Sequence, residues 1–129
     1  MAFNTDCFDY ERIEDLPNKD TQNFYNETKT VVINFTILGY FDEADDGVAF
    51  MVKADDVKKI YRMLKNEDLS NGFHDFIIWT SMEYLSQYKG KASQIIVGSD
   101  EWEKFADVYI TIRLLKMIVR NDPIPFFLK

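Results

Sequence analysis

The strongest constraint on the fold is a run of β-branched and aromatic residues that a single acidic segment interrupts. Residues 31–41 alternate apolar side chains on one face with polar side chains on the other, a pattern typical of a β-strand. Residues 42–47 contain four carboxylates and end in a glycine, so they cannot continue a packed strand. Because the β pattern resumes over residues 48–53, the sequence predicts an antiparallel hairpin over 31–53 with the acidic loop at its tip.

Three helices are predicted after the hairpin, over residues 55–66, 72–89 and 100–120. The first and last of them begin with acidic and end with basic residues, as the helix dipole favours. Apolar residues surround the middle helix on most sides, so we expect it to lie in the centre of the fold. A short β-branched run over 94–98 predicts a third strand. The order of elements therefore indicates an α+β fold, in which a small, mainly antiparallel sheet packs against three helices.

The two ends of the chain differ from this regular pattern. A length of 129 residues predicts a single domain over residues 1–129. Residues 1–30 mix acidic and aromatic side chains around Pro17, so we expect an irregular or short-helical arm packed on the body. The segment 122–129 contains two prolines followed by Phe-Phe-Leu, which predicts an extended apolar tail that packs against the body or contacts a partner.

Composition excludes several classes of protein. With 47% hydrophobic and 29% charged residues the chain has the composition of a globular protein. It has no apolar run of about 20 residues, as a membrane span needs, and residues 1–6 lack the character of a signal peptide, so we expect a cytoplasmic protein without membrane contact. With one cysteine, Cys7, and one histidine, His74, the chain cannot form an intrachain disulfide or a Cys/His zinc site from its own residues. No catalytic motif or phosphate-binding glycine loop is present, so neither an enzyme nor a cofactor is predicted.

The negative charge is concentrated in the first part of the chain. The net charge is −7, which disfavours direct contact with nucleic acid or anionic membranes. Residues 1–50 contain eleven acidic and three basic residues, a net charge of −8, whereas residues 51–129 have a net charge of +1. Two clusters account for most of the excess: Asp6, Asp9, Glu11, Glu14, Asp15 and Asp20 in the arm, and Asp42, Glu43, Asp45 and Asp46 at the hairpin tip. A solvated surface that only maintains solubility is the competing interpretation of either cluster.

Aromatic residues lie next to both acidic clusters. In protein interfaces such rings provide anchoring area, and carboxylates steer a basic partner toward them. The predicted partner-binding residues are therefore Tyr40, Phe41, Asp42, Glu43, Asp45 and Asp46 at the tip, and Asp6, Asp9, Tyr10 and Glu11 in the arm.

The overall profile resembles that of small acidic inhibitors, such as bacterial immunity proteins that neutralise nuclease toxins and phage proteins that block nucleic-acid-handling defence enzymes. The resemblance is one of composition, so it transfers no functional residues. It implies a non-catalytic inhibitor, monomeric or homodimeric, whose carboxylates occupy a basic, nucleic-acid-binding groove of a partner protein as mimics of phosphates.

Two other classes of function remain open from the sequence. A small-molecule or nucleotide-binding domain would use the basic faces of two helices, with Arg62, His74, Arg113 and Lys116 as polar anchors. A structural or oligomerisation module would pair its Phe126–Leu128 tail and an exposed strand edge with another copy.

Overall fold

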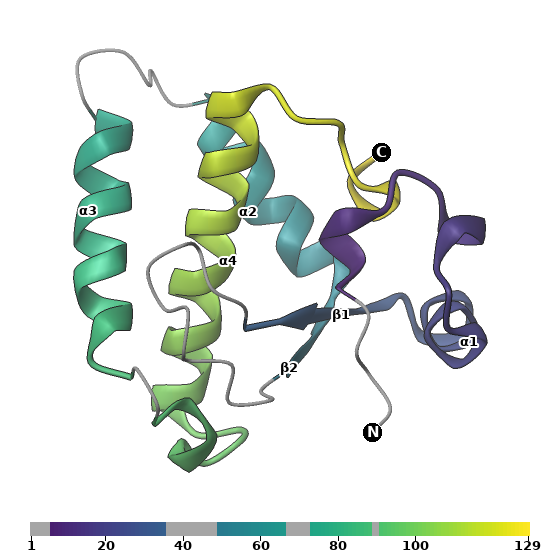
Figure 1. Cartoon of the computed structure of the whole chain (residues 1–129), viewed down its shortest axis with the longest axis horizontal. Helices are drawn as coiled ribbons and strands as arrows, with labels where there is room; N and C mark the ends of the chain where they lie inside the picture. The colour runs from purple at the N-terminus through teal and green to yellow at the C-terminus, as the bar shows by residue number, and fades with distance from the viewer. Residues whose placement is uncertain (1–5, 36–48, 67–72, 89–90) are drawn as a thin grey trace.

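The computed structural model describes residues 6–35, 49–66, 73–88 and 91–129 (Figure 1). Within them the chain forms four α-helices and a two-stranded antiparallel sheet, which confirms the predicted α+β class. The elements are α1 (Lys19–Thr28), β1 (Thr30–Asn34), β2 (Ala49–Lys53), α2 (Ala54–Asn66), α3 (Phe73–Ser86) and α4 (Asp100–Arg120). Four short 3-10 helices join them: η1 (Cys7–Asp9), η2 (Ile13–Asp15), η3 (Ala92–Gln94) and η4 (Phe126–Leu128).

The two strands of the predicted hairpin pair antiparallel, and β1 is the more buried of the two. The predicted continuation of the first strand to residue 41 and the acidic tip lie outside the described residues. Thr30 pairs with Lys53 and Asn34 with Ala49, so the two described strands align along their full length. Successive residues Val31 and Val32 are both fully buried, although a strand with one solvated face would expose one of them. The reason is that α1 and η1 also pack on β1, so the strand is covered on more sides than the alternating pattern indicated.

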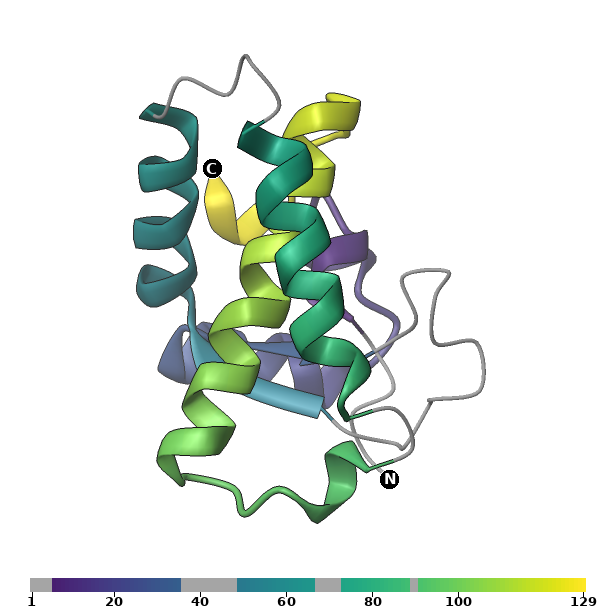
Figure 2. The same cartoon turned by 90° about the vertical axis from the view of Figure 1, so that its left-hand side faces the viewer.

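The order of the helices in space corrects one prediction. α4 lies between α2 and α3, and α3 lies at the edge of the molecule, where it packs mainly on α4 (Figures 1 and 2). Phe76 and Trp79 of α3 are 63% and 65% exposed. The prediction that this helix is central was therefore wrong, because an apolar composition shows that a helix can be buried but not that other elements surround it.

The segment 94–98 does not form the predicted third strand. It contains the end of η3 followed by a turn, and Gly98 takes a positive φ of 87°. Local hydrogen bonds occupy its backbone: the amide of Ile95 donates to the carbonyl of Ala92, and the amide of Ser99 donates to that of Ile96. These 3-10 and turn bonds replace the ladder bonds that a strand would need.

The N-terminal arm is more regular than its sequence indicated. The side-chain oxygen of Asn18 accepts hydrogen bonds from the amides of Asp20 and Thr21, so it caps the first turn of α1. α1 ends at Lys29, whose left-handed conformation turns the chain directly into β1. The sequence prediction recognised the turn at Pro17 but not the helix that this turn begins, because residues 19–28 have only two aromatic residues to mark an apolar face.

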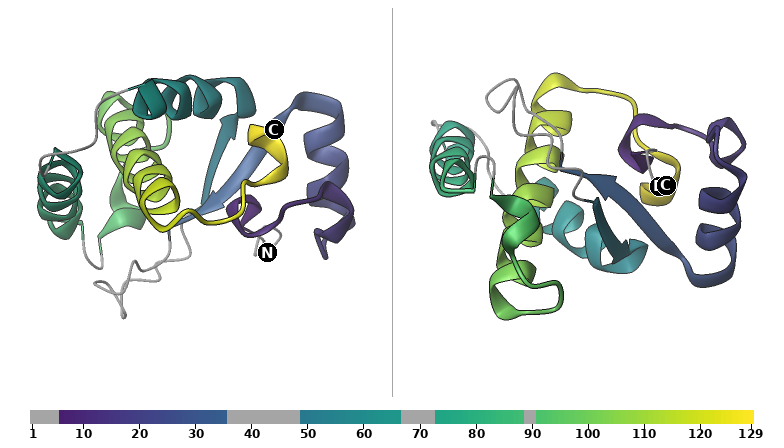
Figure 3. Two further views of the ribbon diagram at one scale, coloured as in Figure 1. Left: turned by 90° about the horizontal axis from the view of Figure 1, so that it is seen from above. Right: turned by 60° about the horizontal axis from the view of Figure 1, so that its bottom comes forward.

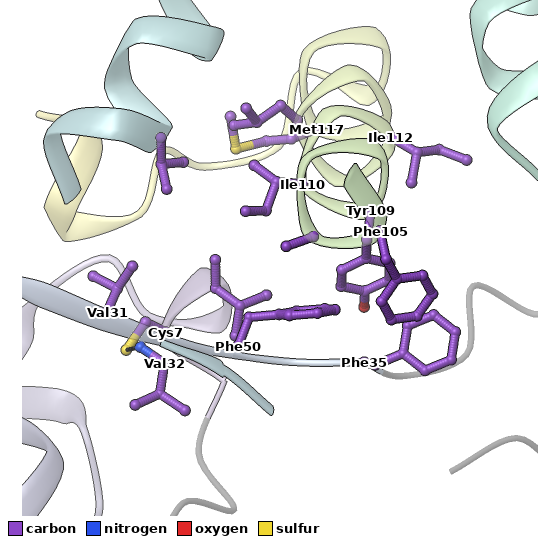
Figure 4. Packing of buried hydrophobic residues seen from close by; sticks show 14 of the residues in the cluster. Cys7, Val31, Val32, Phe35, Phe50, Phe105, Tyr109, Ile110, Ile112 and Met117 are labelled. Carbon is purple, nitrogen blue, oxygen red and sulfur yellow. Dashed lines mark hydrogen bonds between the residues drawn. The ribbon is translucent and has the colours of Figure 1, made fainter. Parts of the chain in front are cut away.

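Aromatic rings from the hairpin and α4 form the centre of the core (Figure 4). Phe35 lies with its ring centroid 5.0 Å from that of Phe105 and 5.1 Å from that of Tyr109, and Phe50 packs against the same two rings. At the free edge of β1, the amide of Val32 donates to the sulfur of Cys7 at 3.4 Å. The arm therefore covers the edge of the sheet that β2 leaves open.

The C-terminal tail packs on the arm, one of the two outcomes that the sequence predicted. The amide of Phe126 donates to the carbonyl of Tyr10 at 3.0 Å. The ring of Phe127 lies 5.4 Å from that of Phe8, in an edge-to-face arrangement, and Phe127 is fully buried. Figure 3 shows the tail running back from the end of α4 to the arm.

Because of this packing, the tail should contribute directly to stability. Phe127→Ala is expected to lower the free energy of unfolding by about 3–5 kcal/mol, the usual loss when a buried ring is removed. Ile124→Ala, at a position in the same tail that is exposed, is the matched control and should change it by less than about 0.5 kcal/mol. Urea denaturation followed by circular dichroism measures both values, and equal effects of the two substitutions would contradict the described packing of the tail.

Candidate functional site

A buried ion pair attaches the acidic arm to α4. One guanidinium nitrogen of Arg113 lies 2.8 Å from a carboxylate oxygen of Asp6. The same nitrogen donates to the hydroxyl of Tyr109 at 3.0 Å, and that hydroxyl donates to the carbonyl of Asn34 at 2.8 Å. The guanidinium also stacks over the ring of Phe8, 4.6 Å from its centroid. The arm, the long helix and the end of β1 are therefore joined by one polar network.

The network keeps Arg113 charged. Burial opposes its charge, but Asp6 and then Tyr109 more than compensate, so the pKa of the guanidinium is raised above its ordinary value. Asp6 was predicted as a partner-binding residue, but its side chain is buried and bonded to Arg113. Its position gives it a structural role in holding the arm, and the acidic surface begins after it.

The exposed acidic residues of the arm occupy residues 9–15, which we call the acidic stretch. Its carboxylates are Asp9, Glu11, Glu14 and Asp15, all exposed. Within it, Arg12 lies 3.1 Å from Asp15 and 3.8 Å from Glu14, and its hydrogen bond lowers the pKa of Asp15. Four carboxylates against one arginine leave the stretch strongly negative.

Asp9 and Tyr10 belong to the acidic stretch but also contact the body. Burial and then the negative charge of Asp6 raise the pKa of Asp9, and Arg113, 3.8 Å away, only partly offsets this rise. Tyr10 is half-buried and accepts the hydrogen bond of the tail through its carbonyl. Of the predicted residues in the arm, Glu11 is thus the one whose side chain is most accessible to a partner. Asp9 and Tyr10 also contact the body, so only part of each side chain is accessible.

The other half of the predicted site lies outside the described residues. Tyr40, Phe41, Asp42, Glu43, Asp45 and Asp46 all fall in the segment 36–48. Their role in partner binding stays a prediction from the sequence.

The structure adds a groove that the sequence did not predict. It has a volume of about 680 Å³, within the usual range of binding sites, and lies between β2, α2 and α4, beside the turn at residues 97–98. Its apolar lining is formed by Met51, Val52, Val57, Ile60, Val97, Trp102, Ala106 and Ile110.

Charged residues border this groove, and carboxylates predominate. Asp56 comes from α2, and Glu103 and Asp107 come from successive turns of α4. Partial burial and then the negative charges of Glu103 and Asp56 raise the pKa of Asp107. Lys53 and Lys59 also line the groove.

The cations of the groove do not pair with its carboxylates. The ammonium group of Lys53 donates to the carbonyl of Thr28, at the end of α1, at 3.1 Å. Among the described residues, Lys59 forms no ion pair with Asp56, Glu103 or Asp107. Within the described part of the chain, no salt bridge therefore neutralises the carboxylates of the groove.

The basic helix faces do not converge on this groove. Arg113, Lys116 and Arg120 border a separate pocket of about 200 Å³ beside Phe8, and Arg113 is also paired with Asp6. Burial and the nearby charge of Arg120 lower the pKa of Lys116. Arg62 is exposed on α2, and the side chain of His74 lies outside the described part of the chain. Of the proposed anchors of a small-molecule site, Arg113 and Lys116 thus border one pocket, and Arg62 does not line it.

The sequence contained a partial signal for the groove. Positions 53, 56, 57 and 60 lie on one face of the chain entering and forming α2, and positions 103, 106, 107 and 110 lie on one face of α4. Each set combines charged with apolar residues, which is an ordinary surface pattern for a helix. Only the packing of α2 beside α4 brings the two faces together.

Comparison of the chain with protein-family models, with curated proteins and with solved structures gives no match. Within the four described ranges, no helix combines the length and apolar character needed to cross a bilayer.

The Asp6–Arg113 pair leads to a test of how the arm is held. Arg113→Met would leave a buried carboxylate without its partner and should lower the free energy of unfolding by about 3–5 kcal/mol. Arg12→Met removes an arginine that is fully exposed and should leave stability nearly unchanged. Urea unfolding of both variants measures the difference.

Cys7 provides a second measurement for the same variants. Burial raises the pKa of its thiol to about 11, so at pH 7 the group is protonated and shielded. Alkylation by iodoacetamide should be slow in the wild-type protein and faster in Arg113→Met, because the arm that contains Cys7 opens more often. Equal alkylation rates in wild type and Arg113→Met would show that the ion pair does not hold the arm.

The raised pKa of Asp107 predicts a pH-dependent effect on stability. A carboxyl whose pKa is higher in the folded state binds its proton more tightly there, so its stabilisation is present at low pH and is lost as pH rises above 3.8, its ordinary value. Asp107→Asn should therefore raise Tm at pH 7, with the gain disappearing near pH 3. Differential scanning calorimetry at both pH values tests this, with Glu11→Gln as the exposed control; a gain that is unchanged at pH 3 would contradict it.

Proposed function

We propose that the protein is a non-catalytic inhibitor that binds a basic partner protein and occupies the groove in which that partner holds nucleic acid. The observation that carries the proposal is the acidic stretch, whose four carboxylates are exposed while its backbone is attached to the body. A surface of this kind attracts a basic partner over a distance and also fixes the position of the charges.

The attachment of the arm supports this function through preorganisation. Cys7 bonds to Val32 before the acidic stretch, Tyr10 bonds to Phe126 within it, and the side-chain amide of Gln22 donates to the carbonyl of Leu16 directly after it, at 2.7 Å. A segment that is already ordered loses less conformational entropy on binding than a free tail would. Ordered carboxylates are therefore better suited to one specific groove than to general solvation of the surface.

In extended or helical backbone, acidic residues at these sequence spacings suit a mimic of the phosphate backbone. Alternate residues of an extended chain are about 6.6 Å apart, and an i, i+4 pair on a helix is separated by about 6 Å along the axis. These distances are comparable with those between neighbouring phosphates of one strand, which are at least about 3.4 Å apart along the axis. The predicted tip carboxylates at residues 42–46 would add further negative charge.

The proposal is tested by capturing a partner and then measuring how it binds. The tagged protein, incubated with lysate of its native cell, should retain a basic nucleic-acid-handling protein that moderate salt releases. The purified partner should lose its bound nucleic acid when the protein is added. Retention of no such partner, or a partner that binds the protein and its nucleic acid together, would contradict the proposal.

Variants of the acidic residues distinguish steering from a structural effect. The triple variant Glu11→Gln, Glu14→Gln, Asp15→Asn and the double variant Asp45→Lys, Asp46→Lys should each slow association more than they speed dissociation, as measured by surface plasmon resonance. Glu83→Gln, which changes an exposed carboxyl of α3, is the matched control and should leave the association rate unchanged. An unchanged rate in both acidic variants would exclude these surfaces as the contact.

A further inference from the structure

We infer that the groove between β2, α2 and α4 is a docking site for a basic amphipathic segment of the partner protein, with apolar side chains on its floor and lysine or arginine beside Asp56, Glu103 and Asp107. This inference deepens the proposed function and rests on it for the origin of the segment. It concerns a surface separate from the acidic stretch.

The floor of the groove is suited to apolar side chains. Val57 of α2 and Ala106 and Ile110 of α4 form the buried base of the cavity, and Ile60 of α2 is half-buried beside them. At its borders Met51 is 55% and Val97 is 74% exposed. Large apolar side chains that are exposed around a groove are typical of an interaction site, because burying them on a partner removes them from water.

The charge of the groove selects a cationic segment. Glu103 and Asp107 lie one turn apart on α4, and Asp56 lies on the facing helix, so a bound chain meets carboxylates from both sides. The raised pKa of Asp107 reflects partial burial and the repulsion among these groups, which a cation between them would relieve.

The same charges disfavour other occupants. The groove has three carboxylates against two lysines, a net charge of −1, and one ammonium hydrogen of Lys53 is already donated to the carbonyl of Thr28. A peptide with basic and apolar side chains satisfies both features of the groove together.

A fluorescence titration tests the inference with a synthetic probe. The chain contains two tryptophans, and Trp79→Phe leaves Trp102, which lines the groove, as the only one. The probe is an amphipathic peptide of leucine and lysine about 14 residues, or four helical turns, long, and its control has glutamate in place of lysine. The lysine peptide should give a saturable change in Trp102 emission, and the glutamate peptide should give none.

Matched variants separate docking from general attraction to an acidic protein. Glu103→Gln with Asp107→Asn should weaken binding of the lysine peptide at least about threefold, the effect expected when two partly exposed ion pairs are lost. Glu83→Gln with Asp122→Asn makes the same change in net charge at exposed positions that line neither the groove nor the acidic stretch, and should leave the affinity within about twofold, because exposed charges at a distance are screened. Thermal unfolding of each variant checks that it is folded.

The outcomes distinguish this inference from the proposed function. Equal weakening by both double variants, or equal binding of the glutamate peptide, would overturn the groove as a docking site for a basic segment. If only the acidic-stretch variants slow association with the purified partner, and the groove variants change neither partner nor peptide binding, the proposed function stands and the docking inference fails. If the groove binds the lysine peptide but the acidic-stretch variants leave association with the partner unchanged, the docking inference stands and the proposed function fails.

Discussion

The structure depends on one buried ion pair, between Asp6 at the start of the arm and Arg113 in the last helix. These residues are 107 positions apart in the sequence, so their contact closes most of the chain into a loop. Burying two charges has a large desolvation cost, and it is tolerated where each group is fully bonded. Here the hydroxyl of Tyr109 accepts a hydrogen bond from Arg113 and donates one to the carbonyl of Asn34. The ring of Phe8 covers the face of the guanidinium.

The sheet and the tail both depend on where this pair places the arm. With only two strands, the hairpin has little capacity to bury itself, and an isolated hairpin is marginally stable in water. η1 supplies the missing cover: Cys7 accepts the hydrogen bond of Val32 at the open edge, and Phe8 and Tyr10 provide the surface on which the tail packs. The apolar tail and the strand edge, on which an oligomerisation module would have relied, are therefore both used inside one chain at these contacts.

The protein presents two negative surfaces of different character. The acidic stretch is exposed, with carboxylates on a backbone that is bonded to the body, and is suited to long-range attraction and to the mimicry of phosphates. The groove combines fewer carboxylates with a large apolar area, which suits short-range contact. A basic partner that uses both would be attracted by the first and held by the second. The exposed aromatic face of α3, with Phe76 and Trp79, is a third surface with no assigned role.

The sequence by itself determined the hairpin and the helices α2 and α4, because the period of apolar residues and the charges at helix ends are local properties. It also located the excess negative charge. Tertiary structure decided the positions of these elements. Asp6 is buried because it pairs with Arg113, and α3 lies at the edge because, among the described elements, it packs mainly on α4. Residues 94–98 form turns because their backbone bonds to carbonyls and amides close in the sequence. The groove exists only because two ordinary helix faces lie side by side. A local pattern shows which face of an element is apolar or charged, but the element that packs against that face comes from a distant part of the chain.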